Sequence, residues 1–138
     1  MTYRYCLDTN VIAFALNRRR PGYAERMSEE LRAGRPMLVP AIVRFELEYG
    51  YAKGDRREAN RAILETLLAR GFEQPAFDIE DAREAGDIRA TLERQGTPIG
   101  WCDTLIAAQA RRRGAVLVTA NRAEFERVPG LVVVDWAA

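Results

Sequence analysis

Short apolar runs alternate with longer stretches of mixed apolar and charged residues along the 138-residue chain. The short runs have the length of buried strands, and polar residues, glycine or proline follow them. They predict strands at residues 3–7, 37–39, 76–79, 115–118 and 131–134. The longer stretches carry apolar residues at helical spacing and predict helices at residues 11–16, 23–32, 41–52, 57–70, 80–94 and 103–112.

This alternation sets the expected fold class. Strands joined through helices form βαβ units, which build parallel sheets. The Val-rich runs at 115–118 and 131–134 lack a polar face, as expected of strands covered on both sides. The sequence therefore predicts an α/β fold, a three-layer sandwich with a central, mainly parallel sheet and helices on both faces. Because we find no linker or internal repeat, we expect residues 1–138 to form a single domain.

Two details of helix packing follow from the same pattern. The helices at 41–52 and 57–70 are expected to form an αα-hairpin around Gly54-Asp55. The helix at 80–94 is expected to turn one apolar face inward, formed by Ala82, Ala85, Ile88 and Leu92.

Acidic residues stand at the ends of predicted elements. Asp8 directly follows the first predicted strand, and Asn121 and Glu124 lie just beyond the strand at 115–118. Because ligands of parallel α/β sheets bind outside the carboxyl ends of the strands, we expect these residues at that edge. Asp103 opens a helix one turn before inward-facing residues, which places its carboxylate on the inner side.

Glu46 is the most informative of these acids. Ile42, Glu46 and Tyr49 recur at helical spacing, which predicts a carboxylate on an apolar helix face, while Glu48 falls on the far side. A glutamate facing the core costs several kcal/mol unless it is paired or bound to a metal.

Each acid also has an ordinary explanation. Asp8 and Asp103 can cap helices, Glu124 can be a solvated surface residue, and an arginine can pair with Glu46. Capping alone does not explain four acids converging on one sheet edge.

The absence of histidine narrows the chemistry. It excludes a Ser-His-Asp triad and any zinc site that needs histidine. Cys6 and Cys102 are too few for a four-cysteine site and are expected to be small buried residues. Converging carboxylates repel one another unless a cation neutralises them, and Mg²⁺ or Mn²⁺ suits such oxygen ligands. An ion of this kind activates water and offsets phosphate charge, which indicates phosphoryl-transfer chemistry.

The residues divide into expected roles around that ion. Asp8 and Asp103 are predicted to ligate it directly, and Glu46 either to ligate it or to orient the attacking water. Glu124 and Asn121 are predicted to act through metal-bound waters or a second ion. Thr9 and Thr119 are expected to donate hydrogen bonds to the carboxylates. One ion and two ions both remain open.

Charge and hydropathy add limits. The net charge is +1, and of the 21 basic residues only Lys53 is a lysine. The arginine clusters at 18–20, 56–57 and 111–113 can form a basic rim for phosphates or simply a solvated surface. No apolar run is long enough to span a bilayer, and no signal peptide is evident, so we expect a cytoplasmic protein without membrane contact.

Several strings stand in a fixed order along nearly the whole chain. They are Tyr5-Cys6-Leu7-Asp8-Thr9-Asn10, Phe45-Glu46-Leu47-Glu48-Tyr49-Gly50, Gly96-Thr97-Pro98-Ile99-Gly100 before Asp103, Leu117-Val118-Thr119-Ala120-Asn121 with Glu124-Phe125, and Val128-Pro129-Gly130-Leu131 before Asp135-Trp136. In this order they resemble the PIN-domain ribonucleases, specifically the VapC-type toxins of bacterial VapBC toxin–antitoxin systems.

The resemblance implies an acidic pocket that binds Mg²⁺ or Mn²⁺. Asp8, Glu46 and Asp103 match the three principal acids of the family, and Glu124 matches its more variable fourth. The matching polar supporting positions are Thr9, Asn10, Thr119 and Asn121.

The resemblance also implies a toxin that cleaves RNA and is silenced by a cognate VapB-type antitoxin. Several relatives with the Gly-Thr-Pro-Ile-Gly string act on tRNA, so tRNA is the favoured substrate class, and a homodimer is expected. The chain departs from the family at Trp101-Cys102, where Pro-Tyr or Pro-Asn is commoner. A tryptophan there can stack a base or pack under its loop.

Two other classes of function compete with this interpretation. A phosphoacceptor domain or a haloacid-dehalogenase-type phosphatase needs an acidic pair after the first strand, where this chain has Asp8-Thr9-Asn10. A non-catalytic binding module would receive a partner's basic side chain in the acidic pocket. An antitoxin could use that same contact, and the apolar faces at 11–16 and 41–52 are candidate grooves for its helix.

Overall fold

The computed structural model describes residues 3–137. Four short strands form one sheet in the order β2-β1-β3-β4, and all neighbours are parallel. In chain order the elements are β1 (Tyr5–Leu7), α1 (Thr9–Asn17), α2 (Pro21–Arg32), β2 (Met37–Leu38), α3 (Ala41–Lys53), α4 (Arg57–Leu68), α5 (Ile79–Arg94), α6 (Trp101–Arg112), β3 (Val116–Val118), α7 (Arg122–Phe125) and β4 (Val133–Val134).

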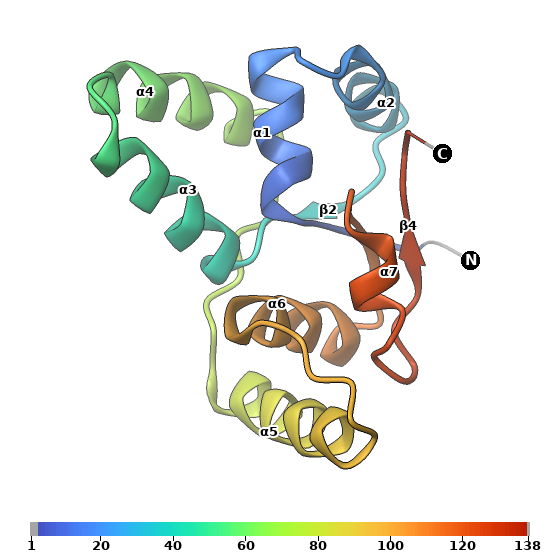
Figure 1. The fold of residues 1–138 in the computed structure, drawn as a ribbon. Helices are drawn as coiled ribbons and strands as arrows, with labels where there is room; N and C mark the ends of the chain where they lie inside the picture. Colours follow the sequence, from blue (N-terminus) through green and yellow to red (C-terminus); the bar gives the residue numbers. More distant parts are fainter. Residues whose placement is uncertain (1–2, 138) are drawn as a thin grey trace.

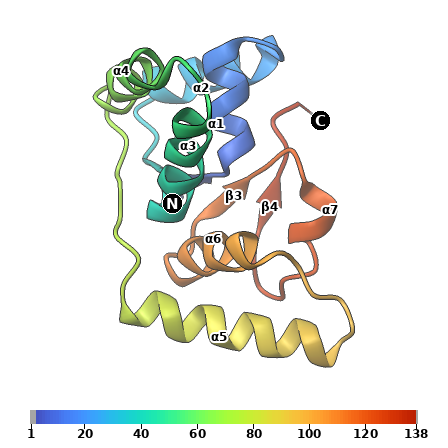
Figure 2. The same cartoon turned by 60° about the vertical axis from the view of Figure 1, so that its left-hand side comes forward.

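The predicted fold class is confirmed. Helices α1 and α2 lie on one side of the sheet, and α6 lies on the other with α5 outside it (Figure 1). Figure 2 shows α5 as the outermost helix, running beneath α6. The αα-hairpin of α3 and α4 extends from the sheet edge, and α3 contacts both α1 and α6.

The central strand β1 of the sheet is fully buried. Cys6 in β1 lies opposite Leu38 of β2 and Leu117 of β3, and all three side chains are buried. Burial raises the pKa of the Cys6 thiol far above its ordinary value, so this cysteine is an inert core residue. Parallel strands of this kind direct their carboxyl ends to one common edge.

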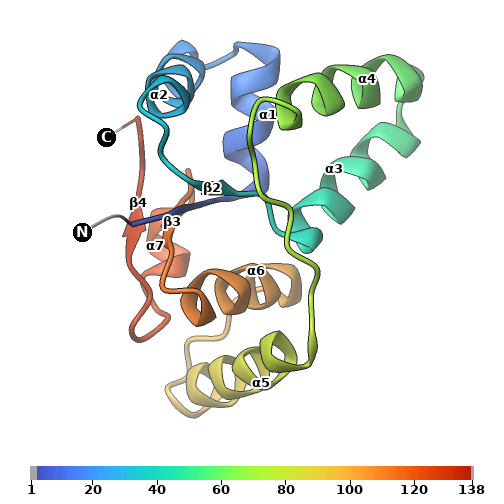
Figure 3. The same ribbon diagram turned by 180° about the vertical axis from the view of Figure 1, so that it is seen from behind.

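The predicted strand at 76–79 is wrong. Ile79 is instead the first residue of α5, and Asp78 caps that helix by accepting a hydrogen bond from the Asp81 backbone N–H. The carbonyl oxygens of Pro75 and Ala76 accept hydrogen bonds from the Gln109 side chain, not from a neighbouring strand. Figure 3 shows this segment as an extended connection between α4 and α5.

The predicted inner face of α5 is wrong at one position. Ala85, Ile88 and Leu92 are buried as expected, but Ala82 is exposed and Asp81 is fully buried in its place. A buried aspartate is tolerated here because Arg112, the last residue of α6, and Arg113, its C-cap, pair with it.

Two further features differ from expectation. The short helix α7 was not predicted, because four residues give too little periodicity. Tyr49 is 57% exposed, and Val43 and Leu47 form the inner face of α3. Within residues 3–137, no helix is both long and apolar enough to cross a membrane.

Candidate functional site

Asp8 lies where β1 ends and α1 begins. Its side chain is only 5% exposed. Its Oδ1 accepts a hydrogen bond of 2.8 Å from the Thr9 backbone N–H, and its Oδ2 accepts one of 2.7 Å from the Thr119 hydroxyl. Because β1 and β3 are parallel, Thr119 just after β3 comes beside Asp8 just after β1. Asp8 is thus the N-cap residue of α1, and it is also fixed to a second strand end.

Glu46 approaches the same sheet edge from α3. The Thr9 hydroxyl donates a hydrogen bond of 2.5 Å to Glu46 Oε1. Thr9 therefore contacts two acids, Asp8 through its backbone N–H and Glu46 through its side chain. This link ties the carboxylate of the αα-hairpin to the end of the central strand.

Asp103 and Glu124 complete the group from the other side. Asp103 is the third residue of α6, whose N-cap is Gly100, and it makes no capping hydrogen bond, so the capping explanation fails for it. Glu124 Oε1 accepts a hydrogen bond of 3.2 Å from the Gly100 backbone N–H, and Oε2 accepts one of 2.5 Å from the Asn121 amide. Glu124 thereby joins α7 to the start of α6.

The four carboxylates interact electrostatically. Burial, followed by repulsion from Asp8, Glu124 and Glu46, raises the pKa of Asp103 from 3.8 to about 7. Burial also raises the pKa of Asp8, with repulsion from Glu46 and Glu124 adding to it and the hydrogen bonds from Thr119 and Thr9 opposing it. The structure thus brings the four predicted acids into one group of negative charge.

No arginine neutralises this group within residues 3–137: none of the ion pairs there involves Asp8, Glu46, Asp103 or Glu124. Glu48 on the same helix, by contrast, pairs with Arg44 and Arg61. An arginine partner for Glu46 was the ordinary alternative to metal binding, and the described chain does not supply it.

The donor set suits a hard divalent cation. All four acids offer oxygen, and Mg²⁺ takes one or two carboxylates with water completing its octahedron. Thr9 and Asn121 hold Glu46 and Glu124 by hydrogen bonds. In this arrangement no three His, Cys, Asp or Glu side chains among residues 3–137 are gathered closely enough to hold an ion. An ion that takes one or two direct carboxylates and completes its shell with water does not need a larger cluster.

The predicted supporting residues divide into two groups. Thr9, Thr119 and Asn121 each contact an acid, and the Asn121 backbone N–H also donates to the Thr119 hydroxyl at 2.9 Å. Asn10 is exposed, and its side chain has no hydrogen bond to these acids within residues 3–137.

Sequence reasoning missed the Gly100 backbone N–H as a partner of Glu124. The Pro98-Ile99-Gly100 string before Asp103 was the available signal.

Cys102 is only partly buried, and burial, with Glu46 and Asp103 nearby, raises the pKa of its thiol to about 11. It therefore stays protonated at neutral pH and does not serve as a thiolate nucleophile.

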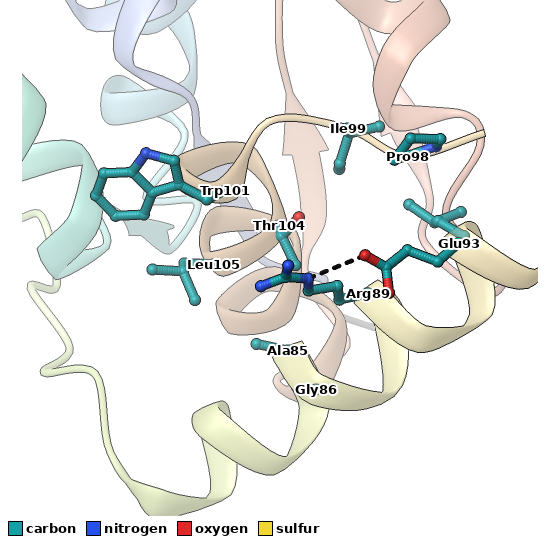
Figure 4. A pocket seen from close by; sticks show the side chains of 10 residues that line it. Ala85, Gly86, Arg89, Glu93, Pro98, Ile99, Trp101, Thr104 and Leu105 are labelled. Atoms are coloured by element: carbon teal, nitrogen blue, oxygen red, sulfur yellow. Dashed lines mark hydrogen bonds and ion pairs between the residues drawn. The ribbon is translucent and has the colours of Figure 1, made fainter. Parts of the chain in front are cut away.

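A groove of about 580 Å³ lies beside the acids and not over them. It runs between α5 and α6, and Ala85, Leu92 and Leu105 give it an apolar lining. Figure 4 shows the Arg89–Glu93 ion pair at this groove and the Trp101 indole projecting from the start of α6.

Known proteins are similar to this chain in both fold and sequence. Residues 5–131 match the PIN domain family. The chain is 38% identical to the tRNA(fMet)-specific endonuclease VapC of Shigella flexneri, covering 97% of this chain and 98% of that protein. It is 39% identical to the protein of the same name from Salmonella typhimurium, covering 96% and 98%.

This chain is also similar to a solved structure. In the VapBC2 complex of Rickettsia felis bound to a DNA fragment from its promoter, one chain aligns with a TM-score of 0.88 and 33% identity. The alignment covers 96% of this chain and 98% of that one. The chain belongs to the PIN domain family. Within that family it is a member of the VapC ribonucleases, as the resemblance implied.

Proposed function

We propose that this protein is the toxin of a VapBC pair and a Mg²⁺- or Mn²⁺-dependent endoribonuclease that hydrolyses tRNA in the cytoplasm. One observation supports it most: four carboxylates lie at one sheet edge, near enough to repel one another electrostatically, and none has an arginine partner among residues 3–137. Residues 1–138 are proposed to act as one PIN-like domain. The two phosphoaspartate alternatives lose their basis, since the family match is to the PIN domain.

The proposed roles follow from the contacts. A bound divalent ion would supply charge neutralisation and an acidified water. Asp8 and Asp103 are the proposed direct ligands, since Asp8 is fixed through both of its oxygens. Glu46, whose Oε1 accepts from Thr9, is proposed to ligate or to orient the attacking water through its other oxygen. Glu124 is proposed to act through water while holding the start of α6.

The supporting residues are proposed to keep these carboxylates in place. Thr119 restrains Asp8, and Asn121 restrains Glu124. Fixing the orientation of a ligand before the ion binds reduces the entropy lost on binding. Asn10 is exposed next to this group and contacts none of the acids. Its proposed role is a direct contact to RNA, and it is the least supported member of the set.

tRNA is the proposed substrate class. Two close relatives carry the name tRNA(fMet)-specific endonuclease, so initiator tRNA is the first candidate. Phosphate binding would fall to arginines outside the ion pairs. The cluster at 111–113 is a poor choice, because all three side chains pair with acids of α5 or its cap. Of the two alternatives for the arginine clusters, the basic rim therefore has no support at residues 111–113.

A VapB-type antitoxin is the proposed protein partner. The Rickettsia felis structure is a VapBC complex, and this chain offers a groove of about 250 Å³ between α1, α3 and α4. Its lining includes Leu16, Leu47 and Ile63, which suit the apolar face of a helix. A basic side chain of the antitoxin entering the acid group would compete with the ion. A homodimer, as the resemblance implies, is proposed for the toxin.

The test is cleavage of total tRNA by purified, antitoxin-free protein. Discrete fragments are expected with Mg²⁺ or Mn²⁺, and none with EDTA or with Asp8→Asn. Folding of Asp8→Asn is checked by circular dichroism. Metal-dependent cuts in other RNA but not in tRNA would overturn only the substrate. No cleavage of any RNA would leave the protein as an acidic-pocket binding module.

A further inference from the structure

Two large aromatic side chains lie exposed beside the acid group. Trp101, the first residue of α6, is 65% exposed, and Phe45 on α3 is 50% exposed. Their ring centroids are 6.1 Å apart and their planes are inclined at 48°. Exposed rings of this size gain free energy when a flat apolar partner covers them.

The pair adjoins the acids through the backbone. Phe45 immediately precedes Glu46, and Trp101 lies two residues before Asp103. Whatever covers these rings therefore lies next to the proposed reaction centre. Trp101 also lines one end of the groove between α5 and α6, and Figure 4 shows its indole projecting away from Arg89 and Glu93.

The exposed aromatic surface continues along α3. Tyr49, one turn beyond Phe45, is 57% exposed, and Lys53 Nζ lies 5.0 Å from the centre of its ring. Positions 45, 49 and 53 share one helix face because they are four residues apart. Aromatic rings followed by a cation are the components of single-strand nucleic-acid sites, where bases stack on the rings and the cation neutralises a phosphate.

We propose that Trp101 and Phe45 form a stacking platform for one unpaired nucleobase of the RNA, adjacent to the phosphate that is cut. This inference rests on the proposed ribonuclease function and specifies how that site selects its substrate. A base held on the platform positions its own phosphate over the carboxylates. A nucleotide within a continuous duplex cannot reach both, so the platform selects unpaired nucleotides.

The main experiment compares variants on RNA cut by the wild-type protein. A synthetic hairpin carrying the mapped cleavage site is the substrate. Trp101→Ala and Phe45→Ala are each expected to raise KM about tenfold, as loss of one stacked base does, with a smaller change in kcat. Trp101→Phe retains a ring and is expected to recover most of the loss. The matched control is Tyr3→Ala, an exposed aromatic residue at the opposite end of β1 from Asp8.

A second set of substrates identifies the base. Hairpins with a single abasic position are scanned across the cleavage site. At one position, removing the base is expected to raise the KM of the wild-type protein about as much as Trp101→Ala raises it on the intact hairpin. The KM of Trp101→Ala is expected to be the same for the abasic and the intact hairpin. Additive losses at every position would show that the ring and the base do not meet, and would overturn the platform.

Fluorescence gives a readout that does not depend on cleavage. The chain has two tryptophans, and Trp136 is buried. In the Asp8→Asn background, the hairpin is expected to quench emission, and Trp101→Phe is expected to remove that quenching. Quenching that persists without Trp101 would contradict direct stacking.

The rival occupant of the rings is a second copy of this chain. In that case Trp101→Ala would lower the molar mass measured by light scattering, and KM would not distinguish abasic from intact RNA. Failure of the proposed function looks different, because the wild-type protein would then cut no RNA at all.

Discussion

The acidic residues at the two ends of α6 differ in their partners. At the carboxyl end, Arg112 and Arg113 pair with Asp81 of α5, which is fully buried. At the amino end, Asp103 lies among three other carboxylates, and no arginine pairs with it within residues 3–137. The acid near the carboxyl end of α6 therefore helps to hold α5 in place. The acids near its amino end have no arginine partner within residues 3–137.

The pKa values show the same division. Burial acts to raise the pKa of Asp81, but hydrogen bonds from Arg113 and Arg112 outweigh it and lower the pKa to about 2. Burial and neighbouring acids raise that of Asp103 to about 7. Both side chains are desolvated, so the partners decide the sign. An acid group held in this unfavourable state is the expected arrangement for a site that gains its cation from solution.

The largest expected effect comes from removing an acid at the unpaired end. Asp103→Asn is expected to lower kcat about 10³-fold, roughly 4 kcal/mol in the barrier, because a direct metal ligand is lost. The control is Glu84→Gln, which removes a carboxylate paired with Arg111 at the other end of the helix. Steady-state cleavage of tRNA measures both. Equal losses in the two variants would show that the acids act through stability alone.

Removing an acid at the paired end is expected to affect stability and not chemistry. Asp81→Ala should cost about 3 kcal/mol in the free energy of unfolding, since it leaves Arg113 without its buried partner. Urea denaturation measures this loss. The contribution of Asp81 is present above pH 4 and is lost as pH falls from about 4 toward 2, because its folded pKa lies below the ordinary 3.8. A loss under 1 kcal/mol would contradict the buried-pair account.

Asp103 should show the reverse dependence on pH. Its folded pKa lies above the ordinary 3.8, so stability is greatest below pH 4 and is lost as pH rises through about 7. In EDTA at pH 8, Asp103→Asn is therefore expected to be more stable than wild type by about 1 kcal/mol, or roughly 3 °C in Tm. Thermal scans measure it. Mg²⁺ or Mn²⁺ should raise Tm of the wild type and not of the variant. An unchanged wild-type Tm in saturating metal would count against the ion.

The sequence predicted the acids at the amino end of α6, which lack arginine partners, better than the buried acid at its carboxyl end. Asp8 follows a strand and Asp103 follows a loop, so a parallel sheet brings them together whatever the exact strand lengths. Asp81 was missed because its burial depends on where α5 starts. The capping box of Asp78 and Asp81 sets that start, and a hydrophobic pattern reads Ala82 as the inward residue. The partners of Asp81 lie 31 and 32 positions away in sequence, beyond the reach of local periodicity.

The same contrast explains the aromatic residues. The periodicity of α3 placed Tyr49 inward with Glu46, whereas packing against α1 and α6 turned Val43 and Leu47 inward. Apolar spacing alone does not distinguish a core side chain from one on an exposed apolar face. Phe45 and Trp101 come from different helices, so their pairing needed the fold.

The smallest expected effect tests whether burial or distance gives the paired end its strength. Arg122 and Glu126 approach within 2.5 Å, about as closely as Arg113 and Asp81 at 2.6 Å, but both side chains are half exposed. Water screens such a pair, and ordering two long side chains offsets most of the gain. Glu126→Gln is therefore expected to change the free energy of unfolding by less than about 0.5 kcal/mol, measured by the same urea denaturation as Asp81→Ala. A loss comparable to that of Asp81→Ala would mean that short distance alone is sufficient, and the unpaired acids around Asp103 would then owe their state to missing contacts and not to desolvation.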